Sequence, residues 1–283
     1  MYVVTGATGQ LGRLVVEGLL AKVPASEVAV VVRSAGKAAG LAERGVTVRV
    51  ADYDRPESLA GAFAPGDRVL LISGSEVGSR IPQHTAVVEA ARAAGVALLA
   101  YTSAPGAATF RLADEHKATE AVIRESGLPF ALLRNGWYTE NYLGDAAGTV
   151  ERGVVVGSAG PEGRIATAPR GDYADAAVAV LTGEGHEGAV YELSGDAAWS
   201  LPELAAELAL VSGRPVGFRE VTPAGHREIL VGAGLPEGFA DILVDVDAGI
   251  ARGELAGTPG DLARLIGRPT VPLADSVRAA LGA

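Results

Sequence analysis

The sequence of 283 residues contains no cysteine. Disulfide bonds, thiolate nucleophiles and iron–sulfur clusters are therefore excluded, and so are zinc sites built on cysteine. The four histidines are scattered, and none forms the His-x-x-x-His spacing that would place two imidazole rings on one metal ion. We therefore predict that the protein uses no metal.

Positive charge and long apolar runs are also scarce. Lysine and arginine number 24 against 34 acidic residues, which gives a net charge of −10 and argues against a nucleic-acid partner. The chain has no run of about 18 apolar residues, so we expect no membrane insertion. A strand-like segment begins at Tyr2 and leaves no space for a signal peptide, and we therefore expect a cytoplasmic location.

Two patterns alternate over the first half of the chain. Residues with helical spacing, such as Leu11, Leu14 and Val15, lie between short apolar runs rich in β-branched residues. The apolar runs occur at 3–5, 28–32, 46–50, 69–72, 97–102 and 130–133. This alternation predicts right-handed βαβ units, because continuously apolar strands are buried on both faces of a parallel sheet. We predict an α/β protein with a Rossmann-type, doubly wound parallel sheet.

After residue 134 the alternation gives way to glycine-rich connections. Further elements are predicted there, with helices at 173–181, 202–211 and 272–281 and strands at 190–193 and 216–221. We interpret them as a smaller C-terminal α/β lobe. The predicted division is a Rossmann domain at 1–134, completed by a returning helix near 172–182, and a mainly substrate-binding lobe at 135–283.

A glycine-rich loop joins the first predicted strand to the first predicted helix. Gly6 permits a tight turn, Gly9 lets the backbone approach a diphosphate, and Gly12 allows helix and strand to pack closely. N–H groups at the start of the helix attract the anion. A glycine triplet alone is a weak signal, and its position between strand and helix carries the prediction. The predicted dinucleotide contacts are Gly6, Ala7, Thr8, Gly9, Gln10 and Leu11.

The residue after the second predicted strand selects the nucleotide. NAD enzymes place an acidic residue there to bind the ribose 2′-hydroxyl, but this chain has Arg33. A guanidinium binds a 2′-phosphate through two hydrogen bonds, so we predict NADPH as the cofactor. The alternative is that Arg33 is a solvated residue at a strand end. The ends of the fourth and fifth strands supply further candidate cofactor contacts, namely Ser73, Gly74, Ser75 and Thr102.

Several motifs together resemble a known family, the NmrA-like group of atypical short-chain dehydrogenases. The resemblance rests on the loop at 6–12, Arg33, Ser126-Gly127-Leu128-Pro129 and Leu133-Arg134-Asn135-Gly136-Trp137-Tyr138. Within that group, the chain is similar to the bacterial NAD(P)H:quinone oxidoreductase 2 proteins at three segments, Ser75-Glu76-Val77-Gly78, Ala113-Asp114-Glu115-His116 and Trp137-Tyr138-Thr139-Glu140-Asn141-Tyr142.

The resemblance implies an enzyme, a flavin-free oxidoreductase that passes hydride from NADPH to a small quinone. It also implies cofactor contacts by Asn135, Gly136 and Trp137. A non-enzymatic regulatory protein that senses NADP(H) remains the alternative, since some NmrA-like proteins resemble that class. The sequence also leaves open whether the chain forms a homo-oligomer.

The catalytic Tyr-x-x-x-Lys pair of ordinary short-chain dehydrogenases is absent, because Leu112 and His116 stand at those positions. A quinone is already a strong electrophile, so positioning and hydrogen-bond donors can suffice for its reduction. We predict His116, Tyr138 and Asn141 as the catalytic donors. His116 as a support for its own helix, and Tyr138 as part of an apolar core, are the alternatives.

Overall fold

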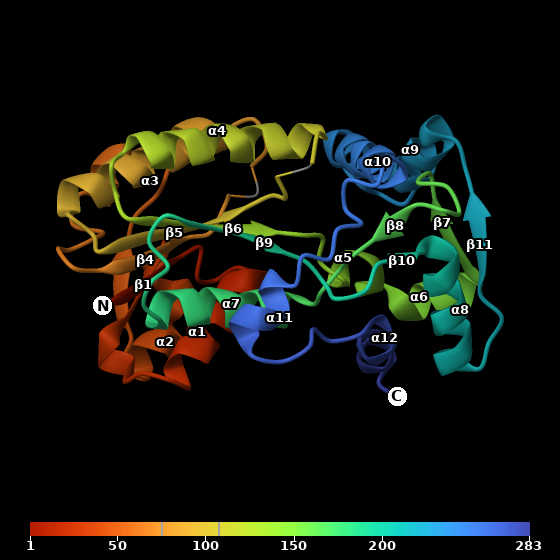
Figure 1. Cartoon of the computed structure of the whole chain (residues 1–283), viewed down its shortest axis with the longest axis horizontal. Coiled ribbons are helices and arrows are strands. Elements are labelled where there is room, and N and C mark those ends of the chain that lie inside the picture. Colours follow the sequence, from red (N-terminus) through yellow and green to blue (C-terminus); the bar gives the residue numbers. More distant parts are fainter. Residues whose placement is uncertain (75, 107) are drawn as a thin grey trace.

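The computed structural model describes residues 1–74, 76–106 and 108–283. Figure 1 shows two lobes side by side, a layered α/β lobe that contains the N-terminus and a smaller lobe of helices and two-stranded sheets. No helix within these ranges is both long and apolar enough to span a membrane.

Seven parallel strands from the described residues form the central sheet, in the order β3-β2-β1-β4-β5-β6-β9. The order reverses at β1, which has β2 on one side and β4 on the other. Doubly wound sheets bind ligands outside such a reversal, at the carboxyl ends of the strands. The predicted fold class is confirmed. The strands are β1 (Tyr2–Thr5), β2 (Val28–Val32), β3 (Thr47–Val50), β4 (Arg68–Leu71), β5 (Leu98–Ser103), β6 (Phe130–Asn135) and β9 (Ala189–Leu193).

Helices cover both faces of this sheet. On the lower face in Figure 1 lie α1 (Gln10–Leu20), α7 (Arg170–Thr182) and the short α11 (Asp261–Ile266). On the upper face lie α3 (Arg80–Ala94) and α4 (Arg111–Glu125). The remaining short elements of this lobe are α2 (Ala39–Glu43) and the 3₁₀ turns η1 (Ala25–Glu27), η2 (Ala35–Ala38) and η3 (Pro56–Leu59).

Neighbouring residues of one strand are buried in different apolar clusters. Val4 and Leu70 pack in the cluster that includes α1 and α7. Val3 and Val69 pack in the cluster that includes α3. All four side chains are fully buried. Burial on both faces explains why the strands are continuously apolar in the sequence.

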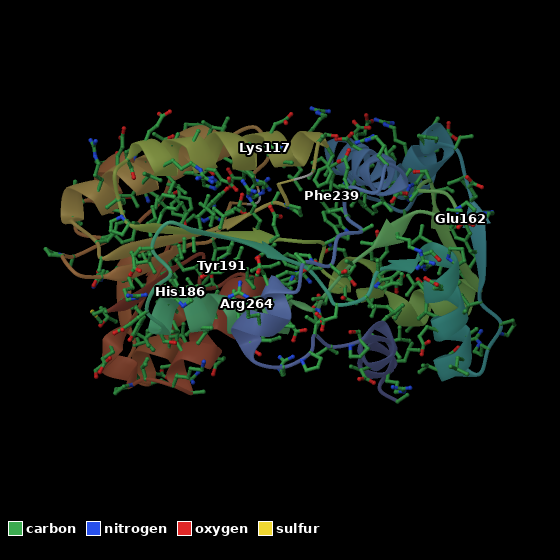
Figure 2. The ribbon with its side chains drawn as sticks, viewed as in Figure 1. Lys117, Glu162, His186, Tyr191, Phe239 and Arg264 are labelled. Carbon is green, nitrogen blue, oxygen red and sulfur yellow. The ribbon has the colours of Figure 1, made fainter. Side chains whose placement is uncertain are left out.

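The strand predicted at 190–193 belongs to the central sheet as β9. It pairs in parallel with β6, where Leu133 lies opposite Tyr191. The interpretation that placed this strand in the smaller lobe is wrong, because apolar alternation marks a strand but does not identify its neighbour. Figure 2 shows Arg264 of α11 and His186 beside Tyr191. The Arg264 guanidinium lies 5.6 Å from the centre of the tyrosine ring, and His186 Nδ1 lies 2.7 Å from its hydroxyl.

The helix predicted near 172–182 is α7, which packs along α1, and α11 packs along α7. Elements from both sides of residue 134 therefore build the first lobe. The division at residue 134 stays an interpretation of the sequence pattern.

The smaller lobe has its own core around Ile165, Trp199, Leu204 and Ile250. β7 and β11 pair in parallel, and β8 and β10 pair antiparallel. A capping box in which Ser200 and Glu203 exchange hydrogen bonds starts α8. The elements are α5 (Glu140–Leu143), α6 (Ala146–Arg152), β7 (Val154–Gly157), β8 (Arg164–Ile165), β10 (Trp199–Ser200), α8 (Leu201–Ser212), β11 (Gly217–Glu220), α9 (Pro223–Gly232), α10 (Glu237–Ala251) and α12 (Leu273–Leu281).

Candidate functional site

The glycine-rich loop lies at the switch point of the sheet, between β1 and α1. Gly6 has a φ of +60°, a left-handed conformation that favours glycine. A Cβ on Gly12 would overlap the carbonyl oxygen of Gly6, so helix and loop approach too closely for any other residue. Gly12 thus allows close packing, and its neighbour is the loop that directly follows β1, where the prediction had the strand itself. In the described part of the chain, no side chain caps the amino end of α1 at Gly9. Its backbone N–H groups therefore suit a diphosphate.

The six predicted loop contacts differ in what they can offer a ligand. Ala7 and Leu11 are buried in the apolar core, so their side chains point away from the sheet edge. Only their backbone atoms can contact a nucleotide. Gly6, Gly9 and Gln10 are exposed and Thr8 is half-buried. The loop is therefore mainly a backbone surface, which is what a diphosphate needs.

The predicted contacts at the ends of β4 and β5 support one another. The Ser73 N–H donates to Thr102 Oγ1 over 2.9 Å, so this hydroxyl fixes the β4 end. The Gly74 N–H donates to His84 Nε2 over 3.1 Å, and the Gly74 carbonyl accepts from Arg80 Nε over 2.7 Å. The segment at the β4 end is thus held by two helical side chains. Ser75, the last member of this predicted group, lies outside the described residues.

His84 is a neutral acceptor in this arrangement. Because Nε2 accepts from Gly74, the proton sits on Nδ1, which lies 2.9 Å from Thr119 Oγ1. Burial, followed by the nearby charge of Arg80, lowers the pKa of His84 to about 4. The imidazole therefore stays uncharged at neutral pH and continues to accept from the backbone.

His116 lies in the same buried network on the upper face of the sheet. Its Nδ1 lies 2.8 Å from the Tyr101 hydroxyl. Burial, then the charge of Arg80, lowers the pKa of His116 to about 3. The ring is therefore neutral near pH 7. His116, like Tyr138 and Asn141, is not among the residues that line the pocket beside Gly136. It contacts Tyr101, whereas Tyr138 packs against Tyr173 of α7 on the opposite face of the sheet.

The end of β6 carries the predicted segment from Asn135 to Tyr138. Asn135 Nδ2 donates to the Tyr138 hydroxyl over 3.2 Å. Asn135 Oδ1 is buried and finds no hydrogen-bond partner among the described residues. A buried orphan acceptor is costly, so it fits a ligand that donates a hydrogen bond there. A Cβ on Gly136 would lie 2.9 Å from the Leu193 carbonyl oxygen, so glycine lets β6 approach β9.

Tyr138 and Asn141 are joined through Arg170. The Arg170 guanidinium lies 4.6 Å from the centre of the Tyr138 ring, and its Nη2 donates to Asn141 Oδ1 over 3.1 Å. Burial raises the pKa of Tyr138, so its phenol keeps its proton at neutral pH. Trp137, by contrast, packs against the apolar core of the smaller lobe.

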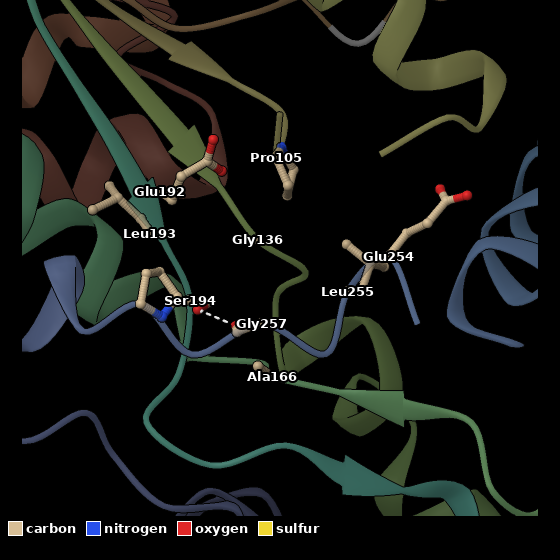
Figure 3. Close-up of a pocket in the computed structure, with 10 residues that line it drawn as sticks. Pro105, Gly136, Ala166, Glu192, Leu193, Ser194, Glu254, Leu255 and Gly257 are labelled. Carbon is tan, nitrogen blue, oxygen red and sulfur yellow. Dashed lines mark hydrogen bonds between the residues drawn. The ribbon is translucent and has the colours of Figure 1, made fainter. Parts of the chain in front are cut away.

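A pocket of about 340 Å³ opens where the two lobes meet. Figure 3 shows it between the chain after β6 at Gly136, the end of β9 and the segment after α10. Ser194 Oγ donates to the Gly257 carbonyl over 2.7 Å and ties two of these walls together. The volume of the pocket is within the range of small-molecule sites. The lining residues are Pro105, Gly136, Ala166, Glu192, Leu193, Ser194, Glu254, Leu255, Gly257 and Pro259.

Sequence reasoning missed an ion-pair network beside this pocket. Arg134 donates to Glu120 through Nε over 2.9 Å and Nη2 over 2.7 Å, and to Glu192 through Nη1 over 2.7 Å. Ser103 adds a hydrogen bond to Glu120 over 2.6 Å. Burial opposes ionisation of Glu120, but the hydrogen bonds from Arg134 and Ser103 lower its pKa. The signal available in the sequence was a single arginine near the end of an otherwise apolar strand.

The NAD(P)H-binding family matches residues 6–184 of the chain. Quinone oxidoreductase 2 from Escherichia coli is 50% identical over 279 residues, which cover 98% of this chain and 97% of that protein. An NmrA-like family domain-containing oxidoreductase from Aspergillus flavus is 32% identical over 98% of this chain and 94% of its own length.

A solved structure extends the likeness to three dimensions. The E. coli NADPH-dependent quinone oxidoreductase 2, crystallised with NADPH, superposes with a TM-score of 0.96 at 49% identity, and the match covers 99% of this chain and 100% of that one. The chain therefore belongs to the NAD(P)H-binding family and, within it, to the NmrA-like oxidoreductases. The family resemblance seen in the sequence is confirmed.

Proposed function

We propose that this protein is an NADPH-dependent quinone reductase that acts without flavin or metal. The observation that carries the proposal is the pairing of two sites on one sheet edge. The glycine-rich loop after β1, with Arg33 beyond it, lies toward one end of this edge, and the pocket beside Gly136 lies toward the other. The relative that is 50% identical bears the name of this reaction.

The residues present fit NADPH. The N–H groups at the start of α1 would hold the diphosphate, and Arg33 would pair with the 2′-phosphate. Backbone at Ser73 and Gly74, and the segment from Asn135 to Trp137, would flank the rest of the molecule. When bound, NADPH supplies a hydride.

The pocket would hold the quinone against apolar walls formed by Leu193, Leu255 and Pro259. A quinone that gains a hydride becomes a hydroquinone anion, which takes up one further proton. Tyr138 keeps its phenolic proton and is hydrogen-bonded to Asn135, the neighbour of the pocket residue Gly136, so it is the first candidate to donate a hydrogen bond to the reduced oxygen. Asn141 and His116 remain the other two candidates, and His116 would have to act as a neutral imidazole.

Turnover tests the proposal directly. Purified protein should consume NADPH when a benzoquinone is added, with no flavin present, faster than the uncatalysed reaction. Tight binding of NADPH without turnover would instead support the NADP(H)-sensing regulatory role. The cytoplasmic location stays a prediction, and the oligomeric state stays untested.

Two substitutions test the assignment of the two ends. Arg33→Ala should weaken NADPH binding about tenfold or more and leave NADH binding nearly unchanged, since a charge-assisted hydrogen bond is lost only with the phosphorylated nucleotide. Equal losses for both nucleotides would contradict the role of Arg33.

Tyr138→Phe should lower kcat about tenfold or more at unchanged NADPH affinity. An unchanged kcat would move the donor role to Asn141 or His116.

A further inference from the structure

A carboxylate lies beside the arginine assigned to the 2′-phosphate. Glu76 Oε1 is 3.5 Å from Arg33 Nη1. The two side chains are 50% and 70% exposed, so both can reach a ligand from solvent. They come from separate strand ends, since Arg33 follows β2 and Glu76 belongs to the connection between β4 and α3.

Glu76 is held in this place by a buried side chain. Gln83 on α3 is only 5% exposed. Its Nε2 donates to Glu76 Oε2 over 3.1 Å and to Asp54 Oδ1 over 2.9 Å. Both amide hydrogens are thus used to hold two carboxylates near Arg33, at the end of the sheet edge where we propose that the adenosine binds (the adenosine end). Gln83 therefore holds the Glu76 carboxylate in the position from which it contacts Arg33, and this contact joins two separate parts of the fold.

The chemistry of the ligand makes this contact consequential. A 2′-phosphate carries close to two negative charges at neutral pH, and it needs the hydrogen-bond donors of the guanidinium. The Glu76 carboxylate engages the same guanidinium and repels the phosphate. A nucleotide with a 2′-hydroxyl places no charge there and does not compete with Glu76.

We propose that Glu76 is a specificity-determining residue, which competes with the 2′-phosphate for Arg33 and so lowers the affinity for NADPH and NADP⁺ relative to their unphosphorylated counterparts. This inference rests on the proposed function, because it requires that Arg33 binds the 2′-phosphate. A weaker hold on the oxidised nucleotide would shorten its residence time, since differences in affinity at one site arise mostly in dissociation.

The test is nucleotide binding by full-length Glu76→Gln, measured by calorimetry. The substituted side chain keeps an amide oxygen that accepts from Gln83, so the loop stays supported. We expect NADPH and adenosine 2′,5′-bisphosphate to bind roughly three- to tenfold more tightly than to the unaltered protein. Binding of NADH and of 5′-AMP should change less than about twofold. The matched control is Asp54→Asn, which removes the same charge from the other carboxylate held by Gln83 and should change NADPH binding less than about twofold.

Three outcomes would overturn the inference. Unchanged or weaker NADPH binding by Glu76→Gln would show that Glu76 does not compete. An equal gain in Asp54→Asn would assign the effect to general charge. A gain that persists when Arg33→Ala is combined with Glu76→Gln would show that the contact with Arg33 is not its cause. Failure of the unaltered protein to bind NADPH would instead contradict the proposed function.

Discussion

The two ends of the sheet edge are built in different ways. At the end that we propose for the adenosine, Arg33 and Glu76 are exposed and share one contact of 3.5 Å. At the pocket end, Arg134 makes three hydrogen bonds to two carboxylates, and one of these, Glu120, is buried. Exposed pairs contribute little to stability, whereas a buried carboxylate depends on its partner. The comparison indicates that nucleotide preference can change without loss of the fold. At the pocket end, by contrast, the ion pairs of Arg134 stabilise the fold.

The largest expected effect would come from the glycine-rich loop at the switch point of the sheet. Gly12→Val places side-chain atoms against the Gly6 carbonyl, so α1 must shift away from the loop. We expect a loss of about 3 kcal/mol in the free energy of unfolding and no measurable NADPH binding. Urea unfolding and nucleotide titration measure the two effects. Gly40→Ala in α2, where nothing lies near an added Cβ, is the control and should have no such effect. Full NADPH binding by Gly12→Val would contradict the assignment of the loop.

Arg134→Met tests whether the ion pairs at the pocket end stabilise the fold. The substitution leaves the buried Glu120 carboxylate without its main partner, and we expect a loss of about 3 kcal/mol in unfolding free energy. Arg124→Met is a matched control, because Arg124 lies 3.7 Å from the same carboxylate but is itself 46% exposed. That change should lower stability by less than about 0.5 kcal/mol. Equal effects of the two substitutions would remove the contrast between exposed and buried partners.

The two buried histidines on the upper face of the sheet are expected to make the stability of the protein depend on pH. An unfolded histidine titrates near pH 6.5, whereas burial lowers the pKa of His84 to about 4 and that of His116 to about 3. Between pH 6.5 and about 4 the unfolded chain therefore binds more protons, and stability falls as the pH is lowered. We expect a loss of about 2 kcal/mol per histidine between pH 7 and pH 5.

Urea unfolding at pH 7, 6 and 5 measures this loss. His84→Gln retains an acceptor for the Gly74 N–H and should remove about half of the pH dependence. His186→Gln is the control, because His186 is more exposed and its pKa is lowered less, so the dependence should stay nearly as steep. A stability that does not change between pH 7 and pH 5 would show that the two buried rings accept protons in the folded state.

The smallest effect is expected at the adenosine end. Arg33→Ala and Glu76→Gln should each change the unfolding free energy of the nucleotide-free protein by less than about 0.5 kcal/mol, because the pair is exposed. The same substitutions are expected to alter nucleotide binding. A large loss of stability in either variant would mean that the Arg33–Glu76 pair, too, stabilises the fold.

Features that depend on neighbours in the sequence were predictable. The glycine loop, the strand before it and the helix after it lie within 20 residues, and Arg33 is found by counting to the next strand end. Features that depend on distant partners were not. Glu192 lies 58 residues from Arg134, and β9 joins β6 across several intervening elements. The burial that keeps His116 neutral also arises only when α3, α4 and β5 pack together.

The late position of β9 in the chain affects how the protein is made. During synthesis the first six strands of the sheet leave the ribosome before residue 189, and α11, which covers the sheet next to β9, follows only after residue 261. Until β9 has been made, one side of β6 has unpaired N–H and C=O groups, which other chains can bind. We expect a fragment that ends at residue 134 to aggregate, and nearly the whole polypeptide must be present before the nucleotide-binding lobe is complete.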